Sequence, residues 1–306
     1  MNPIFTQLRT SVFITTLLFG LMACQNDSKL GSTGNPVKLY FTPSVDAETI
    51  TTNSVHFLKF LEKETGFSFK SGVPANYIAV VEAFGSNRAD IAVMNSFGYI
   101  MTNKKYGAEA KLRVLRYGEP HYRGQIIAHV DSGIKTIKDI DGKRFAFTDP
   151  SSTSGYMFAK KLLKEASAIP SNTTFAQKHD NVVTMVYQGQ VDAGATYYSP
   201  ASKDGKIRDA RARVKTQFPD VEDKVKIIEI TEKIPNDPFV FRKDLPEEIV
   251  SKFIVAVKKY LGTTEGKKIF KTIYSVEGLI DASDADYDGL RSMIESIDLD
   301  TESLIK

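Results

Sequence analysis

The sequence predicts an α/β protein of two lobes, and three observations support that expectation. The chain has 306 residues, which at roughly 150 residues per domain corresponds to about two folding units. Its 42% hydrophobic and 25% charged residues are typical of a globular chain and exclude disorder as its main state. Short apolar segments alternate with longer segments of helical periodicity, as strands and helices do in α/β proteins.

Charge and cysteine content exclude several classes of function. The 40 basic and 37 acidic residues nearly balance, and no long basic run occurs, so we do not expect nucleic acid as a partner. The single cysteine excludes a disulfide framework and a zinc site built from cysteines. Neither HExxH nor GxxxxGK[ST] occurs, so we expect no metal or nucleotide cofactor.

The N-terminal segment predicts secretion and lipidation. Arg9 precedes a short apolar run, 11–22, that is too short to span a bilayer comfortably. The run ends in Leu-Met-Ala-Cys at 21–24, which resembles a bacterial lipobox, although a free cysteine in a membrane anchor is an alternative. We expect a signal peptide over 1–24, a lipid anchor on Cys24 and a flexible polar tether over 25–36. The working domain then lies outside the cytoplasm, in the periplasm or on the outer face of the cell membrane.

Strands and helices alternate after the tether. A helix with Ile50, Val55, Leu58 and Leu61 on its apolar face is expected to stop at Gly66. The sequence predicts further helices at 77–84, 154–167 and 181–188, and strands at 37–41, 67–73, 90–94, 124–130, 144–148, 193–198 and 225–230. This alternation favours largely parallel sheets.

From Pro246 onward we expect only helices. Their predicted ranges are 246–261, 265–274 and 286–297, and such a tail would pack back onto an earlier lobe.

A hydroxyl-rich segment predicts an anion site. Residues 148–157 (TDPSSTSGYM) follow a predicted strand and open a predicted helix. Unpaired amides at a helix start carry positive partial charge, and the hydroxyls of Ser152, Thr153 and Ser154 add donors. Gly155 is expected to let the ligand approach the backbone. One hydroxyl is enough for ordinary N-capping, so four in a row favour binding.

Four other residues are weaker candidates. His179 precedes a predicted helix and could donate to an anion oxygen, although a lone loop histidine is usually surface polarity. Tyr77 and Tyr122 each follow a proline-containing turn and could equally be core aromatics. Asp237 lies in the turn IPNDPFVFR and would repel an anion unless that anion carries a proton.

One motif fits calcium. Asp284, Asp286, Asp288, Gly289 and Glu295 match the pattern D-x-[DN]-x-[DN]-G-x₅-E. A helix start enriched in aspartate explains the same residues through the helix dipole, so we do not expect calcium binding.

Several segments together resemble a transport family. TDPSSTSGYMFAKKLL, HDNVVTMVYQGQVDAGATYY, IPNDPFVFRKDLP and DASDADYDGLR are similar to segments of the phosphate/phosphite/phosphonate-binding subunits of ABC importers. The resemblance runs in order over about 37–299.

The resemblance implies a periplasmic-binding-protein fold (type II-like), in which each lobe is a mostly parallel sheet flanked by helices and the ligand lies in the cleft between lobes. It implies a first lobe of 36–122 with 237–306 and a second lobe of 123–236. It also implies a monomer that delivers a small phosphorus oxyanion to a permease and ATPase without cofactor or catalytic residues. By resemblance, the ligand contacts are Tyr77, Tyr122, Ser152, Thr153, Ser154, His179 and Asp237.

One departure and two alternatives qualify this expectation. Some family members that bind aminoalkyl phosphonates carry a second carboxylate seven residues after the QVD segment, where this chain has Ser199. A ligand ammonium group would therefore have one partner fewer. A binding or sensor lipoprotein for another small ligand is one alternative. A hydrolase with Ser152 or Ser154 and His179 is another, although the G-x-S-x-G motif is absent.

Overall fold

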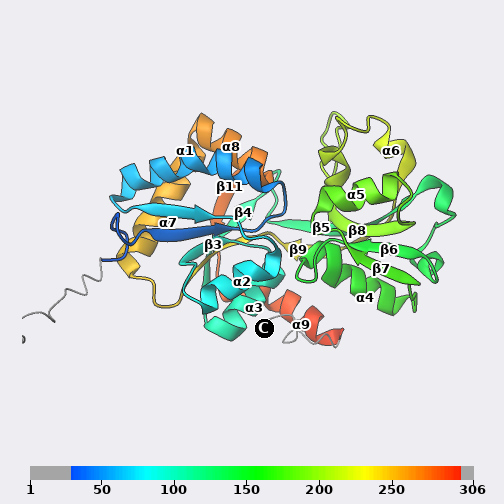
Figure 1. Cartoon of the computed structure of the whole chain (residues 1–306), viewed down its shortest axis with the longest axis horizontal. Helices are drawn as coiled ribbons and strands as arrows, with labels where there is room; N and C mark the ends of the chain where they lie inside the picture. Colours follow the sequence, from blue (N-terminus) through cyan, green and yellow to red (C-terminus); the bar gives the residue numbers. More distant parts are fainter. Residues whose placement is uncertain (1–28, 298–306) are drawn as a thin grey trace, which may run out of the picture.

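The computed structural model describes residues 29–297 and divides them between two lobes (Figure 1). The first lobe contains a six-stranded sheet, in the order β11 (Gly278–Asp281), β4 (Glu109–Leu115), β10 (Pro238–Phe241), β3 (Ile91–Val93), β1 (Val37–Phe41) and β2 (Phe69–Gly72). The second lobe contains a five-stranded sheet, in the order β7 (Asn172–Phe175), β6 (Arg144–Phe147), β8 (Ala193–Tyr198), β5 (His121–His129) and β9 (Val225–Pro235).

The chain passes between the lobes twice, after β4 and after β9, and the paired strands β5 and β9 run between the lobes (Figure 1). His121 pairs with Pro235 and Tyr122 with Ile234, so the two crossings lie side by side. We propose that the first lobe consists of residues 36–122 with 237–306 and the second lobe of residues 123–236.

Both sheets are mixed, which corrects the expectation of mostly parallel sheets. β1 pairs in parallel with β2 and β3, whereas β10 runs antiparallel to β3 and β4, and β11 runs antiparallel to β4. In the second sheet β6 pairs in parallel with β7 and β8, but β5 runs antiparallel to β8 and β9. Strands β5 and β10 follow a crossing and enter their sheets in the reverse direction. Local alternation of strands and helices cannot predict that reversal.

Helices cover both faces of the first sheet. On one face lie α1 (Ala47–Thr65), α7 (Glu247–Gly262) and α8 (Thr264–Tyr274), and on the other lie α2 (Tyr77–Gly85), α3 (Ser96–Tyr106) and α9 (Asp288–Ser296) (Figure 1). Strand β10 shows the alternation that this layering requires. Phe239 and Phe241 are buried in the core under α7, whereas Val240 belongs to the core on the α3 side.

The second sheet is covered in the same way. Helix α4 (Phe158–Glu165) packs on the face that holds Phe145 and Phe147. Helices α5 (His179–Tyr187) and α6 (Val221–Lys224) pack on the face that holds Ala146. Met157 and Phe158 extend into the core of the first lobe, so apolar contacts join the two lobes next to the crossings.

Several sequence expectations need correction. The tail is not wholly helical, because residues 278–281 form β11 at the edge of the first sheet, where Leu279 pairs with Val114. The four residues of β11 begin with a glycine, so their sequence gives only a weak preference for a strand. The strand forms because these residues pair with the edge of β4. In α1 the buried face contains Ile50, Phe57 and Leu61, whereas Val55 is exposed.

The flexible tether was predicted over 25–36, but its residues 29–36 are folded against the first lobe. Residues 29–36 form a turn in which Gly31 donates to the carbonyl of Asn35 and accepts from the amide of Ser68. Leu30 packs against the core of the first lobe. The signal peptide and Cys24 lie outside the described residues. Within residues 29–297, none of the helices has the length and apolar character needed to cross a membrane.

Candidate ligand-binding site

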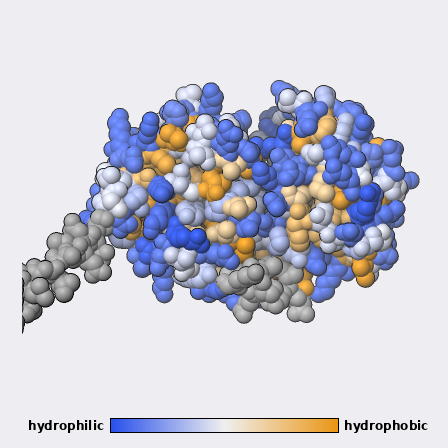
Figure 2. Space-filling view, viewed as in Figure 1, coloured by the Kyte–Doolittle hydropathy of each residue, from blue (hydrophilic) through white to orange (hydrophobic). Residues whose placement is uncertain are grey.

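A cavity of about 70 Å³ lies between the lobes, and Figure 2 shows the surface hollowed between them at its upper edge. At roughly 10–15 Å³ of such volume per water molecule, it has room for about five to seven waters and therefore for a small oxyanion. All seven ligand contacts expected from the sequence line it: Tyr77, Tyr122, Ser152, Thr153, Ser154, His179 and Asp237.

The hydroxyl-rich segment forms one wall of this cavity. Thr153–Met157 is wound as a π-helical turn, and α4 continues it; such turns occur frequently at functional sites. The Ser152 side chain caps the turn by accepting from the amide of Gly155 at 3.1 Å. Ser152, Thr153 and Ser154 are all at most 2% exposed. The segment therefore places three consecutive hydroxyl side chains at the wall of the cavity.

Gly155 serves a different purpose from the one expected. A Cβ atom at this position would lie 2.1 Å from Oγ1 of Thr148, so the glycine makes room for that threonine rather than for a ligand. Thr148 in turn donates to the carbonyl of Ala195 and lies 3.2 Å from Nδ1 of His179. The glycine thus helps to position the histidine.

Several hydroxyls at the cavity keep a proton available. Oγ1 of Thr153 accepts from Nδ2 of Asn95 at 3.1 Å and from the amide of Phe97 at 3.0 Å, so both its acceptor positions are used and it can serve a further group only as a donor. The buried Tyr77 hydroxyl and Thr42 Oγ1 have no hydrogen-bond partner among the described residues. Burial raises the pKa of Tyr77 and of Tyr122 above the usual tyrosine value, which keeps both as donors.

His179 is the first residue of α5 and is held as a neutral imidazole. Burial, with smaller contributions from the charges of Arg213 and Arg116, lowers its pKa to about 3. Nδ1 lies 2.9 Å from Oγ1 of Thr196. When that hydroxyl donates to Nδ1, the ring proton is on Nε2 and is available to a ligand oxygen.

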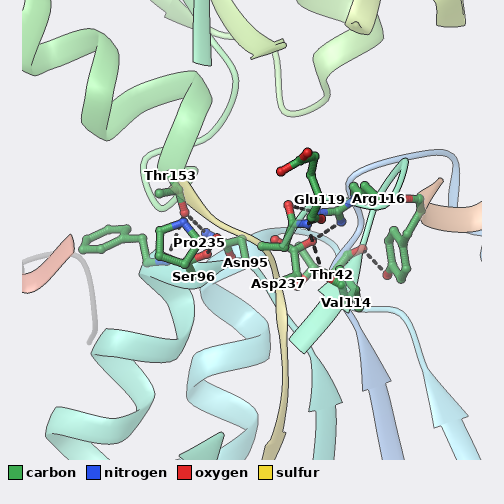
Figure 3. Close-up of polar contacts among 12 residues, drawn as sticks. Thr42, Asn95, Ser96, Val114, Arg116, Glu119, Thr153, Pro235 and Asp237 are labelled. Atoms are coloured by element: carbon green, nitrogen blue, oxygen red, sulfur yellow. Dashed lines mark hydrogen bonds and ion pairs between the residues drawn. The ribbon is translucent and has the colours of Figure 1, made fainter. Parts of the chain in front are cut away.

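Asp237 faces the cavity as half of an ion pair. Its Oδ2 lies 2.5 Å from Nη2 of Arg116, and the Arg116 side chain also donates from Nε to the carbonyl of Tyr274 and from Nη1 to Oδ1 of Asn236 (Figure 3). Asn236 itself donates to the carbonyls of Val114 and Glu119. Burial alone would lower the pKa of Arg116, but the carboxylate of Asp237 outweighs it and the pKa is raised. The aspartate's charge is therefore already matched by a cation.

A sequence model of the family described as "ABC transporter, phosphonate, periplasmic substrate-binding protein" matches residues 39–287. The chain belongs to this family. Its members are periplasmic substrate-binding proteins, so this one acts outside the cytoplasm as the binding component of an ABC transporter for small phosphorus compounds. The two-lobed α/β fold predicted from the sequence is confirmed, with mixed rather than mostly parallel sheets.

Curated relatives agree with this assignment. The "Phosphate-import protein PhnD" of Mycolicibacterium smegmatis is 24% identical over 89% of this chain and 91% of that protein. The "Phosphonates-binding periplasmic protein" of Escherichia coli (strain K12) is 27% identical over 71% of this chain, and the match spans 64% of that relative.

Solved structures of the family share the fold. A binding protein component of an ABC phosphonate transporter from Pseudomonas aeruginosa superposes with a TM-score of 0.74 at 20% identity, covering 88% of this chain and 92% of that one. PhnD1 from Prochlorococcus marinus (MIT 9301), solved in complex with methylphosphonate, superposes with a TM-score of 0.72 at 16% identity. The match covers 85% of this chain and 97% of that one.

Several residues that line the cavity were not predicted from the sequence. Arg116, Arg208 and Arg213 line the cavity, as does Asn95. A single arginine among 40 basic residues gives no signal of its own. Asn95 follows a buried strand at a position typical of a helix N-cap, and only the structure shows its side chain reaching Ser151 and Thr153 in the other lobe.

The calcium-like motif is used for structure. Asp284 accepts from the Tyr99 hydroxyl at 2.5 Å and pairs with Arg291, which also pairs with Asp288. Asp286 caps the turn at Ser283. Within residues 29–297, no group of three or more acidic, histidine or cysteine side chains is arranged to hold a metal ion.

Proposed function

We propose that this protein captures a phosphonate, phosphite or phosphate in the cavity between its lobes and passes it to a permease and ATPase. The observation that carries the proposal is a pair of buried hydroxyls, at Thr42 and Tyr77, which belong to residues lining the cavity and have no hydrogen-bond partner among the described residues. An unpaired buried polar group costs about 1–3 kcal/mol. A ligand with several oxygens would satisfy them together.

Capture would proceed by replacing water around the anion with fixed donors. The hydroxyls of Ser152, Thr153 and Ser154 and the first amides of the π turn would bind the phosphonyl oxygens from the second lobe. Tyr77 would donate from the first lobe, and Nε2 of His179 from α5. Asp237 would accept a hydrogen bond from a ligand that still carries an acidic O–H.

Contacts between the lobes would fix the closed state. Nδ2 of Asn95 donates to the Ser151 carbonyl at 2.7 Å. Nδ2 of Asn95 and the amide of Phe97 also donate to Oγ1 of Thr153 (Figure 3). Both donors belong to the start of α3 in the first lobe, and both acceptors belong to the ligand-facing segment of the second. Ligand capture and lobe closure would therefore share one residue, Thr153, in a hinge motion of the kind known for periplasmic binding proteins.

We propose no chemistry on the ligand. None of the hydrogen bonds among the described residues joins His179 to Ser152 or Ser154, and Nδ1 of His179 faces two threonines. A pKa of about 3 also makes this imidazole a weak base at neutral pH. These observations weigh against the hydrolase alternative.

Membrane attachment through Cys24 is part of the proposal. The expected lipid anchor is supported by the Leu-Met-Ala-Cys segment that follows the apolar run. Cys24→Ser should release the protein from membranes. An equal membrane fraction for both proteins, with no incorporation of labelled palmitate into the wild type, would contradict the anchor.

Calorimetric titration of the protein without its first 24 residues tests the ligand class. We expect binding of methylphosphonate, phosphite or phosphate and weaker binding of sulfate. Absence of binding by every phosphorus oxyanion would overturn the proposal. Binding without ligand uptake by cells that carry the transporter would favour the sensor alternative.

A further inference from the structure

Two arginines of the second lobe lie at the cavity but are not among the residues proposed above to bind the phosphonyl group. Both Arg208 and Arg213 line it. Arg208 precedes a short 3₁₀ helix, Ala210–Arg213, and Arg213 is its last residue. The guanidinium of Arg208 lies 4.2 Å from the ring centre of Tyr117 in the first crossing. Arg213 donates from Nε to the Tyr197 hydroxyl at 3.2 Å and from Nη1 to the Thr272 carbonyl of α8 at 3.5 Å.

Neither arginine forms an ion pair within residues 29–297. Among the described residues, no carboxylate lies within ion-pair distance of Arg208 or Arg213, and the neighbouring Asp209 is bound to Arg211 in a buried pair. An arginine offers five N–H donors. Arg213 uses two of these donors in its bonds to Tyr197 and Thr272. Arg208 donates no hydrogen bond to a described residue, so most donors of the two arginines remain for a ligand. The Asp209–Arg211 pair holds the segment between them in place.

The cavity also lacks a free acid for a cationic ligand group. Asp237 is the only acidic side chain among the described residues that line it, and Arg116 already neutralises that charge. The position at which some relatives carry a second carboxylate holds Ser199, which lines the cavity. Three arginines and one aspartate leave the lining with two more positive than negative groups, while His179 is neutral.

From these contacts we infer that the natural ligand carries a second anionic group, such as a carboxylate, and that Arg208 and Arg213 bind it. This inference rests on the proposed function, because it assumes that a phosphonyl group occupies the hydroxyl-lined wall. An anionic substituent directed toward Arg208 and Arg213 would find unused donors, whereas an ammonium substituent would meet cations.

Three phosphonates of similar size test the inference. Ethylphosphonate carries a neutral substituent, 2-aminoethylphosphonate a cationic one and phosphonoacetate an anionic one. At pH 7.5 and fixed ionic strength, calorimetry should show phosphonoacetate binding at least tenfold more tightly than ethylphosphonate, and 2-aminoethylphosphonate binding more weakly than both.

A double variant assigns the effect to the two arginines. Arg208→Gln with Arg213→Gln should reduce the ratio of phosphonoacetate affinity to ethylphosphonate affinity at least fivefold. The ratio is the readout because a loosened lobe contact would weaken both ligands alike. Arg88→Gln with Lys59→Gln removes two charges from exposed positions outside the cavity lining, so this control should leave the ratio unchanged.

The outcomes separate the two proposals. If ethylphosphonate binds and phosphonoacetate binds no better, the inference is wrong while the proposed function stands. The inference is also wrong if the control variant changes the ratio as much as the arginine variant does. If phosphite or phosphate binds but none of the three phosphonates does, the inference is wrong and the proposed function stands. If no phosphorus oxyanion binds, the proposed function itself fails.

Discussion

The hydroxyl-rich segment and the Arg116–Asp237 pair face the same cavity but are built in opposite ways. Ser152, Thr153 and Ser154 are consecutive and carry no charge, and one local turn positions them. Arg116 and Asp237 are 121 residues apart and meet because the chain crosses between the lobes twice. Donors for an anion can therefore come from local sequence, whereas the electrostatic balance of the site depends on the long-range fold.

The largest effect is expected from breaking the ion pair. Arg116→Met leaves the Asp237 carboxylate without its cation beside an anionic ligand, so affinity for methylphosphonate should fall at least a hundredfold. Stability should fall by about 3 kcal/mol, because removal of one partner leaves a largely buried charge unpaired. Calorimetry and urea unfolding measure the two effects.

Adding Asp237→Asn to that variant removes the unpaired charge and should recover about tenfold of the lost affinity, at roughly 1.4 kcal/mol per factor of ten. If the double variant binds no better than Arg116→Met, the carboxylate does not act on the ligand.

The hydroxyl segment should give the next largest effect. Ser152→Ala with Thr153→Val removes two side-chain donors but keeps the backbone amides. Hydrogen bonds to charged groups contribute about 1.5–3 kcal/mol each, so methylphosphonate affinity should fall at least tenfold. Ser251→Ala with Thr264→Val, at exposed positions outside the cavity, is the matched control. Equal binding by all three proteins would refute the assignment of the phosphonyl site.

His179 predicts a pH effect on stability. Its folded pKa of about 3 lies below the usual 6.5, so between these values the unfolded chain binds more protons and stability falls as pH falls. The slope approaches about 1.4 kcal/mol per pH unit. Between pH 7 and 5, urea unfolding of the wild type should lose about 2 kcal/mol more than that of His179→Gln. Parallel pH profiles for the two proteins would show that the imidazole is not held neutral.

The smallest effect concerns selectivity against sulfate. Phosphite and methylphosphonate can retain an acidic O–H that could donate a hydrogen bond to Asp237, whereas sulfate cannot. Because Arg116 already compensates the charge of the carboxylate, Asp237→Asn should reduce the ratio of phosphite affinity to sulfate affinity only about fivefold, which corresponds to roughly 1 kcal/mol. Titrations with phosphite and sulfate at one pH measure this. Wild-type binding of sulfate as tight as that of phosphite would contradict the role given to Asp237.

The local part of the site was predictable because its signals are contiguous. The run from Ser151 to Ser154 marks a helix start after a strand, and β6 and α4 place it at the cavity. The IPNDP turn marks the second crossing, and its resemblance to the family pointed to Asp237. The expectation that Gly155 lets a ligand approach the backbone was wrong. The packing of the second lobe brings Thr148 against this glycine, and the sequence does not show that contact.

The sequence alone determined the two-lobed α/β class, most helices and strands, and the hydroxyl-rich segment that lines the cavity, because these depend on local periodicity and contiguous side chains. Only the tertiary structure decided the reversed strands, the edge strand at 278–281 and the contact of Asn95 with the opposite lobe. It also decided the pairing of Arg116 with Asp237 and the unpaired state of Arg208 and Arg213. The physical reason is that a charge acts on its neighbours in space, and these neighbours are brought together by two chain crossings rather than by sequence spacing.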